Sequence, residues 1–364
     1  MSKPIELLSP SRSRALKPFL LLAAAAIALT ACSKAKETRA PTPVAAATVP
    51  VAAEGTSIVR LDPALDAIIA PGAVLEKIGG DFGFTEGPVW YRGEIRFSDL
   101  TGNKLYAIGA DGQKRLVMDK SGGKDVIPEG SYQGSNGSAV DKDGTVLMTQ
   151  HGARRIVRVK EDGSIEPFLE RNGNGKRFNS PNDLIFRPDG SLWITDPPYG
   201  LLKQDKDPDK EAAYNAVYRY QDGKITAVIT DMPRPNGIDF SPDGKTLYVS
   251  NSEPEMFVNV YDVSSDGKVS KGRRFITYPG PVPAAGVPDG LKVDSAGNVW
   301  TSGPGGIRII SPEGKVLGQL KSPDPAQANL AWGGPDLKTA YIMAASSVYR
   351  LKLATPGKTP LYSK

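Results

Sequence analysis

Short apolar runs alternate with polar turns along most of the chain. The runs are rich in Val, Ile, Leu, Trp and Tyr, and many of the turns between them contain Asp-Gly or a close relative, as in RPDG, SPDG and PEG. Such turns are typical of tight β-hairpins, because Gly or Asn supplies the positive φ that they require. The best candidate for an amphipathic helix, DPDKEAAYNA, is short. The pattern therefore predicts an all-β body.

Six segments share a longer repeat. Each begins with an oxygen-bearing side chain, continues as a strand, turns and returns as a second strand. The separations between their first residues are 50, 46, 54, 53 and 40 residues, close to the length of a β-propeller blade. We therefore predict a six-bladed β-propeller over residues 56–364, with the six side chains converging on its axis. The six first residues are Glu86, Asn136, Asn182, Asn236, Asp289 and Asn329.

The segment before the first repeat is expected to close the ring. A propeller whose first and last blades are not sealed leaves two strand edges unpaired. Residues 65–78, with the sequence LDAIIAPGAVLEKI, are sufficiently apolar to form a strand. We expect this segment to supply the outer strand of the last blade, which ends at residues 347–353.

The N-terminus has the pattern of an export signal. Four basic residues precede the apolar run 19–29, which is too short to span a bilayer as a helix. The sequence Leu29-Thr30-Ala31-Cys32 resembles the lipobox of bacterial lipoproteins, in which cleavage precedes a cysteine that is then acylated. An ordinary signal peptide is the alternative, but Cys32 is the only cysteine of the chain. We predict a signal peptide over residues 1–31 and lipidation of Cys32.

Residues 32–55 form a candidate tether between this cysteine and the propeller. They are rich in Ala, Pro, Thr and Val and have no strand or helix periodicity. A lipid anchor to a membrane of the cell envelope follows, and Ser33 in place of Asp favours the outer membrane in a cell with two membranes. With a single cysteine, the mature chain has no internal disulfide.

The basic character of the chain belongs largely to the export signal. The formal net charge is +5, and removing residues 1–31 takes away four basic residues and one acidic residue, which leaves +2. The body contains no long basic run and no basic helix. We therefore expect no nucleic-acid partner.

The predicted axis is rich in oxygen ligands. Oxygen donors, without cysteine and with at most one histidine, suit a hard divalent cation, calcium before magnesium or manganese. A dication would neutralise Glu86 and Asp289, which otherwise repel each other. Asn136 and Asn329 can equally be turn residues that end strands. Each second strand returns to the same rim, where Asp196 ends one such strand.

The body of the chain contains a series of distinctive stretches: FTEGPVW, RFSDL, TQHGARRIVR, GKRFNSPNDL, TDPPYG, RPNGIDFSPDGKTLYVSNS, VPDGLKVDSAGNVW, TSGPGG and ANLAWGG. In these stretches it resembles the senescence marker protein 30/gluconolactonase/luciferin-regenerating enzyme family, most closely its bacterial gluconolactonases. The resemblance covers nearly everything from Gly83 to Gly334. It implies a six-bladed propeller with a divalent metal on the axis, usually Ca²⁺, with Mg²⁺, Mn²⁺ or Zn²⁺ as alternatives. By motif, the implied metal ligands are Glu86, Asn182, Asn236 and Asp289.

The resemblance also implies an activity, the metal-dependent hydrolysis of sugar lactones such as gluconolactone. The metal would act as a Lewis acid, and Asp289 is the candidate general base for the attacking water. Animal members hold the sugar with an arginine and a further glutamate, whereas Ser180 and Pro181 precede Asn182 here. The identity of the lactone therefore does not carry over.

Four side chains are expected to line the substrate cup. His151, the only histidine, stands at the end of a second strand and would hold substrate hydroxyls or transfer a proton. The four residues are Asn136, His151, Asn182 and Asp196.

Two other interpretations stay open at this point. The same site would also suit another ester or a phosphotriester. A non-catalytic sugar-binding propeller on the cell envelope is the alternative from a different class, although two carboxylates on the axis argue against a mere scaffold.

Overall fold

The computed structural model describes residues 50–280 and 286–363, which contain strands β1–β25 and two short 3₁₀ helices, η1 (Pro63–Ala67) and η2 (Gln204–Lys206). The predictions for the signal peptide, for Cys32 and for most of the tether fall on residues 1–49, outside the described residues. Within the described ranges no helix has the length and apolar character needed to cross a bilayer.

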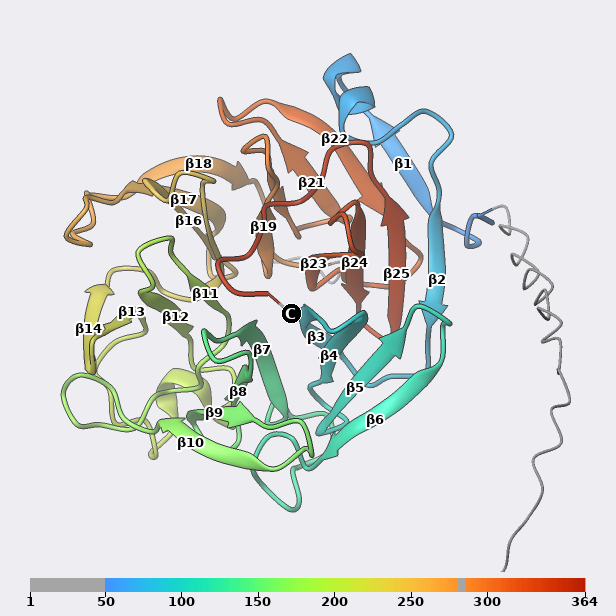
Figure 1. The fold of residues 1–364 in the computed structure, drawn as a ribbon. Helices are drawn as coiled ribbons and strands as arrows, with labels where there is room; N and C mark the ends of the chain where they lie inside the picture. Colours follow the sequence, from blue (N-terminus) through green and yellow to red (C-terminus); the bar gives the residue numbers. More distant parts are fainter. Residues whose placement is uncertain (1–49, 281–285, 364) are drawn as a thin grey trace, which may run out of the picture. The chain divides into compact units, whose positions relative to one another are not determined.

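Six antiparallel sheets surround a central axis, which confirms the predicted six-bladed propeller (Figure 1). The first two blades from the axis outward are β3 (Thr85–Tyr91), β4 (Glu94–Asp99), β5 (Lys104–Gly109) and β6 (Lys114–Asp119), then β7 (Ser135–Val140), β8 (Val146–Gln150), β9 (Arg155–Val159) and β10 (Ile165–Leu169). The next two are β11 (Leu184–Phe186), β12 (Leu192–Asp196), β13 (Ala216–Gln221) and β14 (Lys224–Ile229), then β15 (Pro235–Phe240), β16 (Thr246–Asn251), β17 (Met256–Asp262) and β18 (Arg273–Tyr278).

The last two blades each take a strand from the N-terminal segment. Blade five consists of β19 (Leu291–Val293), β20 (Val299–Thr301), β21 (Ile307–Ile310), β22 (Val316–Lys321) and the added strand β1 (Ser57–Arg60). Blade six consists of β23 (Asn329–Gly333), β24 (Thr339–Ala344), β25 (Ser347–Lys352) and β2 (Leu75–Gly79).

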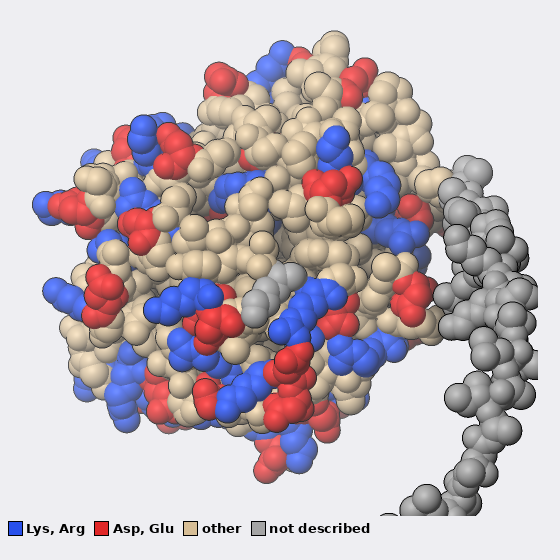
Figure 2. All heavy atoms as spheres, viewed as in Figure 1, with Lys and Arg blue, Asp and Glu red and all other residues tan. Residues whose placement is uncertain are grey.

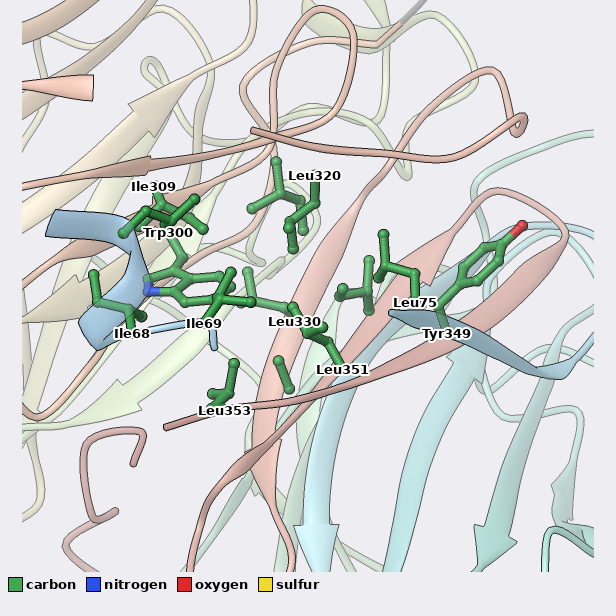
Figure 3. Packing of buried hydrophobic residues seen from close by; sticks show 14 of the residues in the cluster. Ile68, Ile69, Leu75, Trp300, Ile309, Leu320, Leu330, Tyr349, Leu351 and Leu353 are labelled. Carbon is green, nitrogen blue, oxygen red and sulfur yellow. The ribbon is translucent and has the colours of Figure 1, made fainter. Parts of the chain in front are cut away.

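The ring closes as the sequence predicted. Strand β2 pairs antiparallel with β25, with Leu75 opposite Leu351, so the N-terminal segment provides the outer strand of the last blade. The pairing of β1 with β22 was not predicted. The two strands and η1 bury an apolar cluster between blades five and six that includes Ile69, Leu75, Trp300 and Leu351 (Figure 3). Burial of apolar surface therefore fixes the seam of the ring.

The polar-Gly pairs at the start of the inner strands bring neighbouring blades close together. A Cβ on Gly87 would lie 1.8 Å from Asn136 O, and a Cβ on Gly237 would lie 2.3 Å from Asp289 O. The pairing of β3 with β4 shifts register just after Glu86, and that of β15 with β16 shifts just after Pro235. Such irregularities re-aim side chains. The glycines thus allow the inner strands to converge, and the register shifts fall next to the polar side chains at the axis.

The C-terminal strap, which we define as residues 358–363, covers one end of the central channel. Figure 1 shows the chain ending over the centre of the ring. The Lys358 ammonium pairs with the buried Asp239 carboxylate and donates to Phe240 O (2.6 Å). The Tyr362 ring packs edge-on against Phe186 with centroids 4.9 Å apart. On the face drawn in Figure 2, basic and acidic side chains are interspersed around the rim.

Candidate metal centre and substrate cup

A cavity of about 520 Å³ opens at the other end of the channel, and we call it the axial cup. Its floor carries five of the six repeated side chains, and its walls come from the connections between strands. The lining includes Phe84, Glu86, Tyr132, Asn136, His151, Asn182, Tyr199, Gln204, Asn236, Ser252, Glu253, Asp289 and Gln327.

Glu86 is buried at the start of β3, and its carboxylate is fixed by neutral donors. Its Oε2 accepts from Gly87 N (2.7 Å) and from Asn329 Nδ2 (3.0 Å). Burial raises the pKa of Glu86 to about 7, the nearby Asp183 adds to this, and the two hydrogen bonds and Lys292 oppose it. The environment therefore disfavours an isolated negative charge at this position.

Asp289 lies just before β19 and interacts with the Glu86 carboxylate at the floor of the cup. Burial raises the pKa of Asp289 well above its usual value, and repulsion by Glu86 and Asp183 raises it further, while a hydrogen bond from Asn236 acts in the opposite direction. Among the described residues, no lysine, arginine or histidine lies within 4.0 Å of either Glu86 or Asp289. In the described part of the chain, two buried carboxylates thus meet with no cationic side chain at ion-pair distance.

Three asparagines complete the floor as a relay of amides. Asn136 Nδ2 donates to Asn182 Oδ1 (2.8 Å), Asn182 Nδ2 donates to Asn236 Oδ1 (2.5 Å), and Asn236 Nδ2 donates to Ser252 Oγ (3.0 Å). Asn136 Oδ1 is buried and has no hydrogen-bond partner among the described residues. Since buried polar atoms are usually satisfied, this oxygen is available to a ligand or to water.

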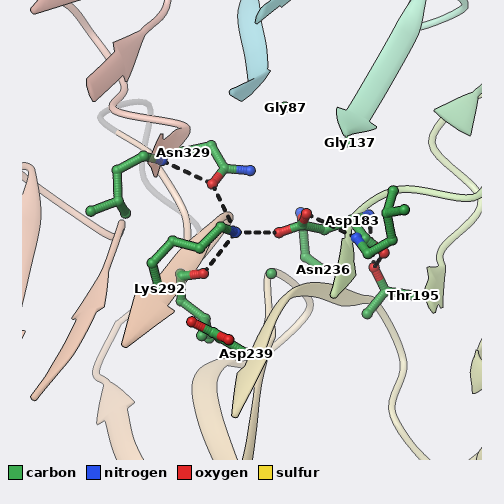
Figure 4. Close-up of polar contacts among 12 residues, drawn as sticks. Gly87, Gly137, Asp183, Thr195, Asn236, Asp239, Lys292 and Asn329 are labelled. Atoms are coloured by element: carbon green, nitrogen blue, oxygen red, sulfur yellow. Dashed lines mark hydrogen bonds and ion pairs between the residues drawn. The ribbon is translucent and has the colours of Figure 1, made fainter. Parts of the chain in front are cut away.

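A second charged layer lies towards the strap end of the channel, where Lys292, Lys358 and Asp239 line another cavity; Figure 4 shows the contacts of Lys292. Lys292 Nζ pairs with Asp183 Oδ2 (2.9 Å) and lies 3.5 Å from Asn329 Oδ1, while Lys358 pairs with Asp239. With the cup floor, the layer sets four carboxylates against two ammonium groups: Glu86, Asp183, Asp239 and Asp289 against Lys292 and Lys358.

The charge balance and the donor set fit a hard dication. Counted as ions, the four carboxylates exceed the two ammonium groups by two negative charges, and both unneutralised carboxylates lie in the floor of the cup. Carboxylate and amide oxygens are the ligands that calcium prefers. The residues at the floor of the cup therefore fit a divalent cation.

His151 is fully buried beside this floor. Its Nδ1 lies 3.0 Å from Tyr132 O, and its Nε2 lies 3.4 Å from Asn136 Nδ2. Burial lowers the pKa of His151 to about 4. The imidazole is therefore neutral near pH 7 and presents Nε2 to the amide relay. This favours a hydrogen-bonding role over proton donation from an imidazolium.

A family model described as the SMP-30/gluconolactonase/LRE-like region matches residues 84–346. The chain belongs to this family. The matched region contains the six inner strands and every residue of the axial-cup floor named above.

Relatives of this gluconolactonase-like chain cover most of its length. A gluconolactonase from Zymomonas mobilis is 37% identical over 313 residues, which cover 82% of this chain and 87% of the relative. A pentonolactonase from Haloferax volcanii is 29% identical over 270 residues, covering 71% and 81%. Among solved structures, a gluconolactonase from Xanthomonas campestris matches with a TM-score of 0.73 at 30% identity, covering 84% of this chain and 97% of that chain.

One side chain of this family member does not lie as the sequence suggested. The carboxylate of Asp196 is fully buried, accepts from Asn179 N (2.9 Å) and Ser180 N (2.8 Å), and is not part of the described cup lining. The sequence left open whether Asn329 reaches the axis or only ends a strand, and in the structure its amide donates to the carboxylate of Glu86. Asp196 is taken up by the loop before β11, and strand periodicity gives no information about such a loop.

Sequence reasoning missed most of the cup walls and the charged layer. Tyr132, Tyr199, Gln204 and Glu253 come from connections whose lengths differ between blades, so the repeat did not identify them. A signal for Lys292 was present, because a lysine stands inside the apolar inner strand Leu291–Val293. A charged residue in such a strand indicates a buried ionic partner.

Proposed function

We propose that this protein is a metal-dependent lactonase that opens sugar lactones in the axial cup. The observation that carries the proposal is the pair of buried, unneutralised carboxylates, Glu86 and Asp289, set among amide oxygens at the floor of the cavity. The relatives named gluconolactonase and pentonolactonase support the choice of lactones as the substrate class.

In this proposal Glu86, Asn182, Asn236 and Asp289 hold a divalent cation, with Ca²⁺ as the first choice. When bound, the cation would supply Lewis-acid polarisation of the lactone carbonyl. Asn329 and Gly87 fix Glu86 through its Oε2, and the relay from Asn136 to Ser252 fixes the three asparagine side chains. The ligand set is thus oriented by neighbouring side chains, as an outer shell should do.

Asp289 is proposed as the general base. Water adds to the lactone carbonyl carbon while a carboxylate oxygen of Asp289 takes one of its protons. The bond between that carbon and the ring oxygen then breaks, and the proton passes from Asp289 to the departing ring oxygen. The products are a carboxylic acid and a hydroxyl group on one open chain, so no further reactant is required.

Asn136 and His151 are proposed to hold the substrate. The unpartnered Asn136 Oδ1 offers an acceptor, and neutral His151 keeps the Asn136 amide in place through Nε2. Asn182 contributes from the same floor. Asp196 is left out of this set because it is buried against Asn179 and Ser180.

Metal removal and Asp289→Asn test the proposal together. Chelation should abolish hydrolysis of glucono-1,5-lactone, and Ca²⁺ should restore it. Asp289→Asn should lower kcat by at least about 100-fold, because the amide cannot accept the proton, while calorimetric binding of the lactone persists. Full activity after verified metal loss would refute the mechanism. An aryl ester and a phosphotriester assayed in parallel measure whether the site prefers lactones.

We also propose that the chain works at the cell envelope, tethered through an acylated Cys32. The support is the lipobox-like sequence that ends at this single cysteine. Metabolic labelling with a fatty-acid probe should mark the full-length protein and leave Cys32→Ala unlabelled. Equal labelling of both proteins would contradict the anchor.

A further inference from the structure

One wall of the axial cup comes from two connections that carry none of the proposed metal ligands. The connection between β12 and β13 supplies Gln204, and the connection after β16 supplies Glu253. Both residues line the same cavity as Glu86 and Asp289. A molecule held at the floor of the cup would therefore have this wall beside it.

The guanidinium of Arg234 contacts both connections of this wall. Arg234 Nη1 donates to Gln204 Oε1 (2.5 Å) and lies 3.6 Å from Glu253 Oε1. Its Nη2 pairs with Asp205 Oδ2 (2.9 Å), and its guanidinium carbon lies 5.6 Å from the centroid of the Tyr199 ring. The Arg234 side chain is only 16% exposed. Because a guanidinium presents its donors in a rigid fork, it fixes two separate connections relative to each other.

Gln204 and Glu253 both have polar groups that are free to hydrogen-bond a molecule in the cup. The oxygen of the Gln204 amide is occupied by Arg234, whereas its NH₂ group has no partner among the described residues. The Glu253 carboxylate is 36% exposed, and the only described group paired with it is Arg234, at 3.6 Å. The wall therefore offers the cup two acceptor oxygens and two donor hydrogens.

We propose that Glu253 and Gln204 form the subsite that recognises the hydroxyl groups of a polyhydroxylated ring, with Arg234 as their positioning residue. The inference deepens the proposed function, on which it rests, by assigning the choice among lactones to this wall. Neighbouring hydroxyls each donate and accept, so a carboxylate and an amide NH₂ complement them. A ring without hydroxyls would desolvate the Glu253 carboxylate without replacing its hydrogen bonds, and the site would discriminate against it.

The test compares two six-membered lactones, glucono-1,5-lactone and the unhydroxylated δ-valerolactone. Glu253→Ala and Gln204→Ala should each lower kcat/KM for glucono-1,5-lactone by about tenfold or more, mainly through KM. The same variants should change kcat/KM for δ-valerolactone by less than about threefold. Arg234→Lys, which keeps the charge and loses the fork, should reproduce the pattern of Glu253→Ala.

Matched controls come from the same connections. Glu255 lies two residues beyond Glu253 and pairs with Arg274 on the outer part of the blade, and Lys206 lies two residues beyond Gln204 and is exposed. Glu255→Ala and Lys206→Ala should leave the ratio of the two kcat/KM values unchanged. Equal losses on both lactones in the wall variants, or no loss on either, would overturn the proposal.

A binding measurement separates this inference from the proposed function. The probe is 1,5-anhydroglucitol, a polyhydroxylated six-membered ring that has no carbonyl group and cannot be hydrolysed. Calorimetry on the Ca²⁺-loaded protein should show binding that Glu253→Ala weakens about tenfold or more and Glu255→Ala does not. If the wild-type protein hydrolyses neither lactone, the proposed function fails, and this titration alone supports or rejects the subsite. Equal affinities of wild type and Glu253→Ala would reject it.

Discussion

At the scale of single residues, the buried carboxylates near the axis are of two kinds: two are paired with a lysine and two are not. Asp183 and Asp239 each contact a lysine, whereas Glu86 and Asp289 interact with each other and have no cationic side chain of the described residues within 4.0 Å. Burial of charge without a partner is costly. The two unneutralised carboxylates therefore mark the position where a cation gains most from binding.

His151 gives a pH dependence of stability that can be measured. Burial lowers the pKa of His151 to about 4, below its ordinary 6.5, so the native state favours the neutral imidazole. Its contribution to the free energy of unfolding is complete above pH 6.5 and is lost as the pH falls towards 4. The loss should be on the order of 3 kcal/mol at pH 4. Chemical denaturation at pH 7, 5.5 and 4 measures it.

A variant that cannot titrate serves as the control. His151→Gln removes the imidazole, so the difference in unfolding free energy between wild type and variant should shrink as the pH falls from 6.5 to 4. Other titrating groups are common to both proteins and cancel in this difference. A difference that does not depend on pH would show that His151 is not buried in the neutral form.

The sequence allowed the floor of the cup to be predicted, but not the second charged layer. The period of the repeat placed Glu86, Asn182, Asn236 and Asp289 at equivalent positions, and equivalent positions converge on the axis of a ring. Lys292 and Asp183 pair across 109 residues, and no local pattern reports such a contact. The position of Asp196 was missed for the same reason, since its partners belong to an irregular loop.

At the scale of elements, the inner strands depend on glycine for their close approach. Gly237 N donates to Asp289 O (3.0 Å), and a Cβ on Gly237 would lie 2.3 Å from that oxygen and 2.5 Å from Leu291 N. Both atoms are backbone, so neither can rotate away. The spacing between β15 and β19 is therefore set by the absence of a side chain.

Gly237→Ala should be strongly destabilising. We expect a loss of about 3 kcal/mol or more in the free energy of unfolding, because an inner strand must shift to admit the methyl group. Gly175→Ala is the matched control, since its site is open and only its positive φ opposes a side chain, which should cost about 1 kcal/mol. Urea denaturation compares the two. Similar losses in both variants would contradict a steric origin.

The elements themselves were predicted unevenly. An outer strand from residues 65–78 was expected because an open ring leaves an unpaired edge, and in the structure the strand within this segment is Leu75–Gly79, preceded by η1. Strand β1 was not expected, since Ser57–Arg60 is short and adds a fifth strand to a blade that four strands already complete. The fold requires that the ring be closed, so a closing strand can be expected. It does not require an extra outer strand, so a single sequence does not predict one.

At the scale of the whole molecule, stability should depend on the seam between the N-terminal segment and the last blade. Leu75 is buried there in the cluster with Leu351 and Tyr349. Leu75→Ala should lower the free energy of unfolding by about 2–5 kcal/mol through the cavity that it leaves. Leu61, which is 60% exposed, provides the control, and Leu61→Ala should change stability by less than about 0.5 kcal/mol. Comparable losses would show that the seam does not hold the ring.

The pairing of Leu75 with Leu351 also sets an order of events during synthesis. The N-terminal partner leaves the ribosome roughly 275 residues before the strand that it must join, so the loop to be closed spans nearly the whole propeller, and contacts of such range form slowly. The strands of blades one to five can pair within each blade as they emerge. Strand β2 has no partner until β25 has been synthesised. The nascent chain is thus most prone to wrong strand partners just before its last blade is complete.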